Sequence, residues 1–184
     1  MFVERKCCWH EEGCPHQAKL SSITSHEVSC PYQLVTCWHC SQSASLINFH
    51  HHSPDMTCFY KKKVFSSPVK VVMSVKDTPA VAVTLGGDVF YLRVSHMRAR
   101  SVWVVYLAAQ LTLEDCSKYR TTLELSSLLQ GGVSRLPGPP SSMTQSLEEV
   151  IKTGHYILVS ESDMRNLSSP NGLFRLSCQI TRNM

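Results

Sequence analysis

Cysteine and histidine, two side chains that commonly bind transition metals, are concentrated at the start of this 184-residue chain. The first 58 residues hold seven of the nine cysteines and seven of the nine histidines. The rest of the chain has only Cys116, Cys178, His96 and His155, each isolated from the others in sequence. The sequence therefore has two parts, and the residues of the first part are the ones that predict chemistry.

The spacing of these residues divides them into two sets of four. The first set is Cys7-x6-Cys14-x11-His26-x3-Cys30, and the second, six residues further on, is Cys37-x2-Cys40-x11-His52-x5-Cys58. Three thiolates and one imidazole suit a structural, tetrahedral Zn²⁺ site in which protein atoms fill every position. We therefore predict two zinc fingers, at about 7–30 and 37–58 within a region spanning 1–60, each with one structural zinc ion.

The two sets also form an internal repeat with an offset of 26 residues, in which the following pairs align: Cys14 with Cys40, Leu20 with Leu46, Ile23 with Phe49, and His26 with His52. On a helix, residues six and three positions before the histidine lie on roughly its face, so we expect both apolar residues to close over the metal. The offset also favours His52 over His50 and His51 as the second histidine ligand.

Three other interpretations compete with structural zinc. A disulfide framework requires an oxidising compartment and leaves the histidines unexplained. A nucleophilic Cys/His pair has no reason to be repeated. A nucleic-acid-reading finger is the stronger rival, but the helix predicted over Leu46–Met56 has no Lys or Arg to contact phosphate or guanine. We interpret Cys8, His10, His16 and His39 as residues that do not bind the metal.

Composition limits the remaining classes. Lys plus Arg exceed Asp plus Glu by 4, too little to argue for nucleic acid. The longest apolar run, Val102–Ala109, is far shorter than the roughly 20 residues of a membrane helix. Charged residues 4–6 follow the N-terminus without an apolar segment, which predicts no secretory signal. We expect a protein of the cytoplasm, with the nucleus as a second location, and no membrane partner.

The second part, 64–184, is predicted to be an antiparallel β-sandwich. Short β-branched and aromatic runs are separated by turn sequences such as Gly86-Gly87-Asp88, and these runs predict strands over Val69–Val75, Ala80–Leu85, Val89–Val94, Val102–Ala109, Tyr119–Leu125, Tyr156–Val159 and Leu173–Ile180. A capping box at Ser146-Leu-Glu-Glu149 predicts a short helix, with a second turn over Met164–Leu167. No pattern of catalytic residues occurs there, and we interpret its isolated Cys and His residues as packing or surface residues.

Several motifs resemble the seven-in-absentia (Siah) family of ubiquitin ligases along nearly the whole chain. In the first finger the resemblance is Cys7-x5-Gly13-Cys14-x11-His26-Glu27-x2-Cys30-x6-Cys37. Further on, four segments resemble successive family strands in order: Leu85–Leu92, Trp103–Leu107, Tyr119–Leu125, and Tyr156–Val159 followed by Asn171–Leu173.

The resemblance implies a mainly β protein in which two zinc fingers precede a TRAF-like sandwich that dimerises and binds extended peptides. Two departures concern the binding regions. The second finger has Cys37-x2-Cys40 and Cys58 where the family has Cys-x6-Cys and a final histidine. Segment 78–83 has neither the tryptophan nor the methionine of the family's peptide groove.

From the resemblance we expect a substrate- or adaptor-binding module in ubiquitin-dependent degradation. The partners would be proteins or peptides and a second copy, or a RING-containing relative, while nucleic acid is the alternative ligand. The two fingers take up the Cys and His residues that a RING domain would need, so we expect ubiquitin ligase activity only where a RING is supplied by another chain or segment. The expected cofactor is Zn²⁺, two ions per chain.

Overall fold

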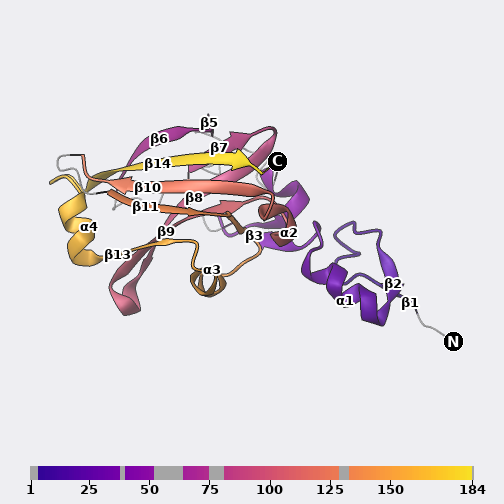
Figure 1. Ribbon diagram of the computed structural model, residues 1–184. Coiled ribbons are helices and arrows are strands. Elements are labelled where there is room, and N and C mark those ends of the chain that lie inside the picture. Colours follow the sequence, from indigo (N-terminus) through magenta and orange to yellow (C-terminus); the bar gives the residue numbers. More distant parts are fainter. Residues whose placement is uncertain (1–3, 38–39, 52–63, 75–80, 129–132, 184) are drawn as a thin grey trace.

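A computed structural model describes residues 4–37, 40–51, 64–74, 81–128 and 133–183 of the chain. Figure 1 shows two stacked β-sheets, with the N-terminal segment extending beyond the end of the sandwich at which α2 lies. The chain is mainly β with mostly antiparallel pairing, as the sequence predicted. Within the described residues, no helix is both long and apolar enough to cross a membrane.

The smaller sheet has four strands in the order β11-β10-β14-β6. Their bounds are β6 (Val69–Ser74), β10 (Tyr119–Ser126), β11 (Val133–Gly138) and β14 (Leu173–Arg182). Buried and more exposed residues alternate along β6 and β14, because successive side chains of a strand point to opposite faces. One face of this sheet therefore packs in the core, while the other carries polar residues such as Arg120 and Arg175.

The larger sheet has six strands in the order β12-β9-β8-β7-β5, with β13 also paired to β9. The bounds are β5 (Val64–Ser66), β7 (Val81–Leu85), β8 (Asp88–Met97), β9 (Val102–Ala109), β12 (Ser141–Ser142) and β13 (Ile157–Ser160). Two short pairs, β5 with β7 and β12 with β9, are parallel. The uninterrupted apolar sequence of β9 reflects burial on both faces of this sheet.

The main core lies between the two sheets. Phe90, Leu107, Leu125 and Phe174 are fully or almost fully buried in it. The other face of the larger sheet, represented by Tyr91 and Val104, belongs to a second cluster, which also contains Val150 of α3 and the N-terminal residues Val35, Cys37, Leu46 and Phe49. The larger sheet is thus the middle layer of the molecule.

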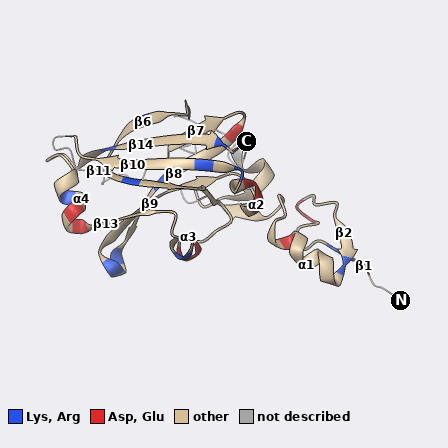
Figure 2. Ribbon diagram, viewed as in Figure 1, with Lys and Arg blue, Asp and Glu red and all other residues tan. Residues whose placement is uncertain are grey.

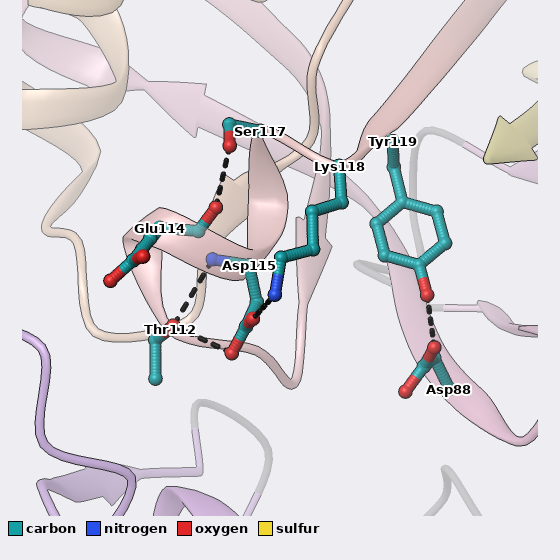
Figure 3. A network of polar contacts seen from close by, with 7 residues as sticks. All are labelled: Asp88, Thr112, Glu114, Asp115, Ser117, Lys118 and Tyr119. Carbon is teal, nitrogen blue, oxygen red and sulfur yellow. Dashed lines mark hydrogen bonds and ion pairs between the residues drawn. The ribbon is translucent and has the colours of Figure 1, made fainter. Parts of the chain in front are cut away.

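Three short helices connect the strands of the sandwich: α2 (Leu113–Cys116), α3 (Leu147–Thr153) and α4 (Glu161–Leu167). The predicted capping box of α3 is present, because Ser146 accepts from the Glu149 amide while the Glu149 carboxylate accepts from the Ser146 amide. Figure 3 shows the surroundings of α2, where the Thr112 hydroxyl caps the helix and Lys118 pairs with Asp115 at 2.6 Å. Beside it, the Tyr119 hydroxyl donates to Asp88 and links the two sheets.

The N-terminal part contains small elements. A β1 (Glu4–Lys6) and β2 (Gln17–Lys19) hairpin leads into α1 (Leu20–Val28). A second hairpin of β3 (Leu34–Thr36) and β4 (Ser43–Ser45) leads into a 3-10 helix, Leu46–His51. The two hairpin-helix units correspond to the two halves of the sequence repeat.

The strand predictions for the sandwich are confirmed, although several elements were missed. Each predicted strand overlaps one of β6, β7, β8, β9, β10, β13 and β14, and β9 has the predicted bounds. The missed strands β5, β11 and β12 are short or rich in Ser, Pro and Gly, which weakens the strand signal. The described residues after 64 contain three short α-helices and a 3-10 helix, Arg98–Arg100, instead of one or two helices. The four-residue α2 and the three-residue 3-10 helix are too short to show a helical period.

Candidate metal centre

The first predicted ligand set comes together in the structure. Cys7 follows β1, Cys14 precedes β2, His26 lies in the last turn of α1, and Cys30 follows that helix. Their ligand atoms all lie within 4.8 Å of one another. The distances are 3.9 Å from Cys7 Sγ to Cys30 Sγ, 3.6 Å from Cys30 Sγ to Cys14 Sγ, and 3.3 Å from Cys14 Sγ to His26 Nε2.

These distances suit a tetrahedral zinc ion. Two thiolates about 2.3 Å from a tetrahedral Zn²⁺ are about 3.8 Å apart. The three cysteines are almost completely buried, which leaves the ligand atoms facing one another and not the solvent. Four protein atoms would complete the coordination, so such an ion would stabilise the fold and have no open position for a substrate.

The burial of the ligand side chains means that their thiolate forms would need a bound cation. It raises the pKa of the Cys30 thiol to about 12, since a thiolate without a counter-ion is poorly solvated there. Burial also lowers the pKa of His26, which favours the neutral imidazole that binds metals. A divalent ion would reverse the preference of the thiols, because its charge stabilises the thiolates.

Residues that the sequence did not select surround the ligands. The His16 ring stacks on the His26 ring, with centroids 4.0 Å apart, and His10 Nδ1 lies 2.9 Å from the Cys14 carbonyl oxygen. The Glu27 carboxylate accepts from the Cys8 amide at 2.8 Å, which fixes the backbone next to Cys7. These contacts orient the ligand side chains, as residues next to the ligands do at many metal sites. The contacting residues do not recur in the second half of the repeat, so the repeat could not reveal them.

The local backbone explains two further positions. Gly13 has a φ of +101°, and a Cβ there would lie 3.3 Å from the Tyr32 ring, so glycine is required. Gln33 donates its amide to the carbonyl oxygens of Glu27 and Val28 at 2.6 and 2.9 Å. That amide satisfies the open C-terminal end of α1, which keeps His26 in place.

The expectation that both apolar repeat residues close over the metal is half right. Ile23 is fully buried and packs with Cys7, Cys14 and Cys30. Leu20, in contrast, is 62% exposed. At about 3.6 residues per turn, Ile23 lies about 60° around the helix axis from His26 and Leu20 lies about 120° from it, so Leu20 is off the ligand face.

The second predicted ligand set is only partly within the described residues. Cys37 is completely buried and Cys40 is half-buried, and the Ser41 amide donates to the Cys37 carbonyl oxygen at 2.8 Å. His52 and Cys58 lie outside the described residues. The second zinc site therefore stays a prediction.

The remaining cysteines and histidines agree with a packing role. Within the part of the chain that the structure describes, no disulfide joins any of the eight cysteines. Cys116 and Cys178 are buried in the main core, and His96 stacks on Trp103 while pairing with Glu161 at 3.1 Å. Cys8 is exposed and is not one of the four clustered ligands, although its Sγ also lies within 4.8 Å of the ligand atoms of Cys7 and Glu27.

The first cluster can therefore hold a metal ion, and its closed set of protein ligands favours a structural role. A comparison of the chain with models of known protein families found no match. A comparison with curated proteins also found no match.

Proposed function

We propose that the chain is a non-catalytic module that binds protein or peptide ligands, with zinc holding its N-terminal fingers in shape. The Cys7, Cys14, His26 and Cys30 cluster supports this because a closed Cys3His set fits a structural ion. The sandwich that follows would supply the recognition surface. Its similarity in motif order to Siah-type ligases suggests the recognition half of such a ligase, or a relative without a RING.

The observation that carries this proposal is the edge strand β6. It pairs with β14 on one side, from Val69 opposite Cys178 to Ser74 opposite Leu173. Among the described residues no strand pairs with its other side. An extended peptide can add to such an edge through main-chain hydrogen bonds, while neighbouring side chains select its sequence.

Two exposed side chains of β6 would give this edge its selectivity. Lys70 and Val72 point away from the core, and Val72 is 56% exposed. A β-branched residue exposed to that degree beside a basic one favours a peptide with apolar and acidic side chains. The known edge strands of soluble proteins are usually shielded, so an open one is a reasonable binding site.

Protein ligands are favoured over nucleic acid by the distribution of charge. Neither α1 nor the 3-10 helix Leu46–His51 contains Lys or Arg. In the coloured part of Figure 2, Lys and Arg are scattered over several elements of both parts of the chain. A nucleic-acid site generally groups its cations along one face to follow the phosphates.

The proposal can be tested by panning a phage-displayed library of random dodecapeptides against the full zinc-loaded chain. Hydrogen exchange with a selected peptide should then protect the β6 amides. Val72→Asp and Lys70→Glu should weaken binding, while Gln179→Asp, exposed on β14 of the same sheet, should not. Failure to enrich any peptide, or affinity that falls steeply with salt for a random oligonucleotide instead, would count against the module.

Assembly and ubiquitin transfer need separate measurements. Sedimentation equilibrium should give a dimer, and a monomer at every concentration would remove dimerisation from the proposal. With activating and conjugating enzymes, the purified chain should transfer no ubiquitin unless a RING-containing relative is added. Transfer by the chain alone would overturn its non-catalytic role.

A further inference from the structure

Two adjoining hollows lie between the N-terminal part and the sandwich. The first, about 590 Å³, is bordered by the α1 region on one side and by α2 and α3 on the other. The second, about 350 Å³, lies between β3, strands β8 and β9, and the start of α3. Thr144 and Gln145 line both, so the hollows share a wall. We call the combined depression the trough; Figure 1 shows α1, α2, α3 and β3 around it.

The end of the trough beside α1 is mainly apolar. Trp9, Val28 and Leu113 line it, and Val28 and Leu113 are 65% and 49% exposed. Exposed apolar side chains from two distant parts of the sequence thus border one hollow. The Trp9 indole Nε1 is buried without a hydrogen-bond partner among the described residues. A ligand with a large apolar side chain would suit this end of the trough.

The end of the trough beside β3 is polar, and Arg93 is the single charged residue among those that line it. Its guanidinium lies 5.2 Å from the centre of the Tyr106 ring, which holds the side chain against the sheet. Next to it, the Gln145 Oε1 accepts from the Ser142 amide at 2.9 Å. That bond orients the Gln145 amide group with its Nε2 left to donate to a ligand.

We propose that the trough binds an extended segment of a partner protein that carries a carboxylate close to a large apolar side chain. The carboxylate faces Arg93 and Gln145, and the apolar side chain lies against Trp9, Val28 and Leu113. Charge selects this occupant, because the polar end is positive whereas Glu27 and Glu149 line the other end with Lys152. A polyphosphate backbone spanning the trough would meet those two carboxylates.

This surface is separate from the β6 edge. Strand β6 is at the edge of the four-stranded sheet, whereas the trough borders the outer face of the larger sheet. The trough also includes both the first finger and the sandwich, which gives the fingers a part in recognition besides their own folding. The inference concerns the same class of ligand as the proposed function but does not depend on strand addition.

The test uses the full zinc-loaded chain and fluorescein-labelled synthetic peptides taken from the dodecapeptide library. Enriched peptides should contain Asp or Glu near Leu, Ile, Phe or Trp, and the Kd is read from fluorescence anisotropy. Leu113→Asp, Val28→Asp and Arg93→Glu should each raise the Kd about tenfold or more. Leu158→Asp, on an exposed site of β13, and Arg165→Glu, on an exposed site of α4, are matched controls that should change it less than about twofold.

Metal content and thermal midpoint identify any variant that fails to fold. If Arg93→Glu fails to fold, Arg93→Gln replaces it. The Val28 and Leu113 variants change exposed side chains and still test the inference. The inference is overturned if the three trough variants bind every selected peptide like the native chain. If Val72→Asp alone abolishes binding, the β6 proposal stands and the trough is wrong. If no peptide is enriched, both are wrong.

Discussion

The two halves of the N-terminal repeat have similar sequences but obtain their stability from different sources. Ile23 and its repeat partner Phe49 are both fully buried. Among the described residues, Ile23 packs with the cysteines of its own ligand cluster and a few neighbours. Phe49 instead packs against the larger sheet, with its ring 6.0 Å from that of Tyr91. We therefore expect the first half to depend on a bound metal, while the second half is buried against the outer face of the larger sheet.

The other apolar pair of the repeat, Leu20 and Leu46, shows the same difference in burial. Leu20 is 62% exposed and Leu46 is 2% exposed, although they occupy equivalent positions in the repeat. Leu46 is covered because its carbonyl accepts from Gln110 and its side chain joins the cluster on the outer face of the larger sheet. The repeat thus sets which residues are apolar, and the neighbouring surface decides which of them are buried.

Removal of the metal should produce the largest effect. Structural zinc contributes on the order of 10–16 kcal/mol to small modules, and the first half has little other core. A chelator, or His26→Ala, should unfold α1 while the sandwich stays folded. Hydrogen exchange should show loss of protection for the α1 amides and retention in β9 and β14.

Metal analysis checks the same contrast by stoichiometry. We expect two zinc ions per chain, with His26→Ala and His52→Ala each losing one. A native chain with one ion would mean that the second half needs no metal at all. Retained α1 protection in the presence of chelator would contradict the metal dependence of the first half.

Truncation of the buried repeat residues should give the next largest effect. Phe49→Ala leaves a cavity between the second half and the larger sheet, and such changes cost about 3–5 kcal/mol. The thermal midpoint of the sandwich should therefore fall. Ile23→Ala is the matched variant: it should weaken metal retention in the first half and leave the sandwich midpoint nearly unchanged.

Equal effects of the two variants on the sandwich would break the comparison. Such a result would mean that the first half also stabilises the sandwich, through contacts across the trough. Calorimetry measures both midpoints, and metal analysis after gel filtration measures the retained ion.

The contrast between the two halves also shows which features of the fold and of the candidate site could be predicted from the sequence. The ligands of the first site were found because four residues close in sequence must meet at one ion, so their spacing is constrained. Strands with alternating or continuous apolar residues, such as β6 and β9, were found for the same kind of reason.

Features that depend on distant residues could not be predicted. The burial of Leu46 requires the larger sheet, and the parallel pairing of β5 with β7 joins residues far from each other in the order of the chain. His16 and Glu27 support the metal ligands through contacts that only the folded backbone creates. No local pattern distinguishes His16 from a solvent-exposed residue, and the family motif that includes Glu27 does not predict its contact with the Cys8 amide.

Cysteines of the two regions should respond to opposite ends of the pH range. In the first half, protons compete with the metal for the ligands, so the ion should be released as the pH falls. In the sandwich, burial raises the pKa of Cys178 to about 12 from 9.0. Its folded pKa is above the unfolded value, so its contribution is complete below about pH 9 and is lost as the pH rises toward 12.

At pH 10 this loss should be about 1.4 kcal/mol for Cys178, and burial gives Cys116 the same direction of response. Urea unfolding between pH 8 and 10.5 measures it. Cys178→Ala should have lower stability at neutral pH but a shallower alkaline decline. An unchanged slope would show that the Cys178 thiol is not protected from ionisation in the folded chain.

The smallest expected effect comes from the cap of α3, which covers the same face of the larger sheet as the second half of the repeat. Val150 of α3 and Phe49 belong to one cluster, whereas α3 makes no contribution to the cluster of Ile23. Ser146→Ala removes the hydroxyl that accepts from the Glu149 amide and should cost about 1 kcal/mol of stability.

Amide hydrogen exchange measures the effect. If the second half shares this cluster, the exchange of the Phe49 amide should become faster along with that of the α3 amides, while the exchange of the Ile23 amide stays the same. Ser134→Ala, at an exposed site of β11, is a serine control outside the cluster that contains Val150 and Phe49. Faster exchange at α3 without any change at Phe49 would mean that the two cover the sheet independently.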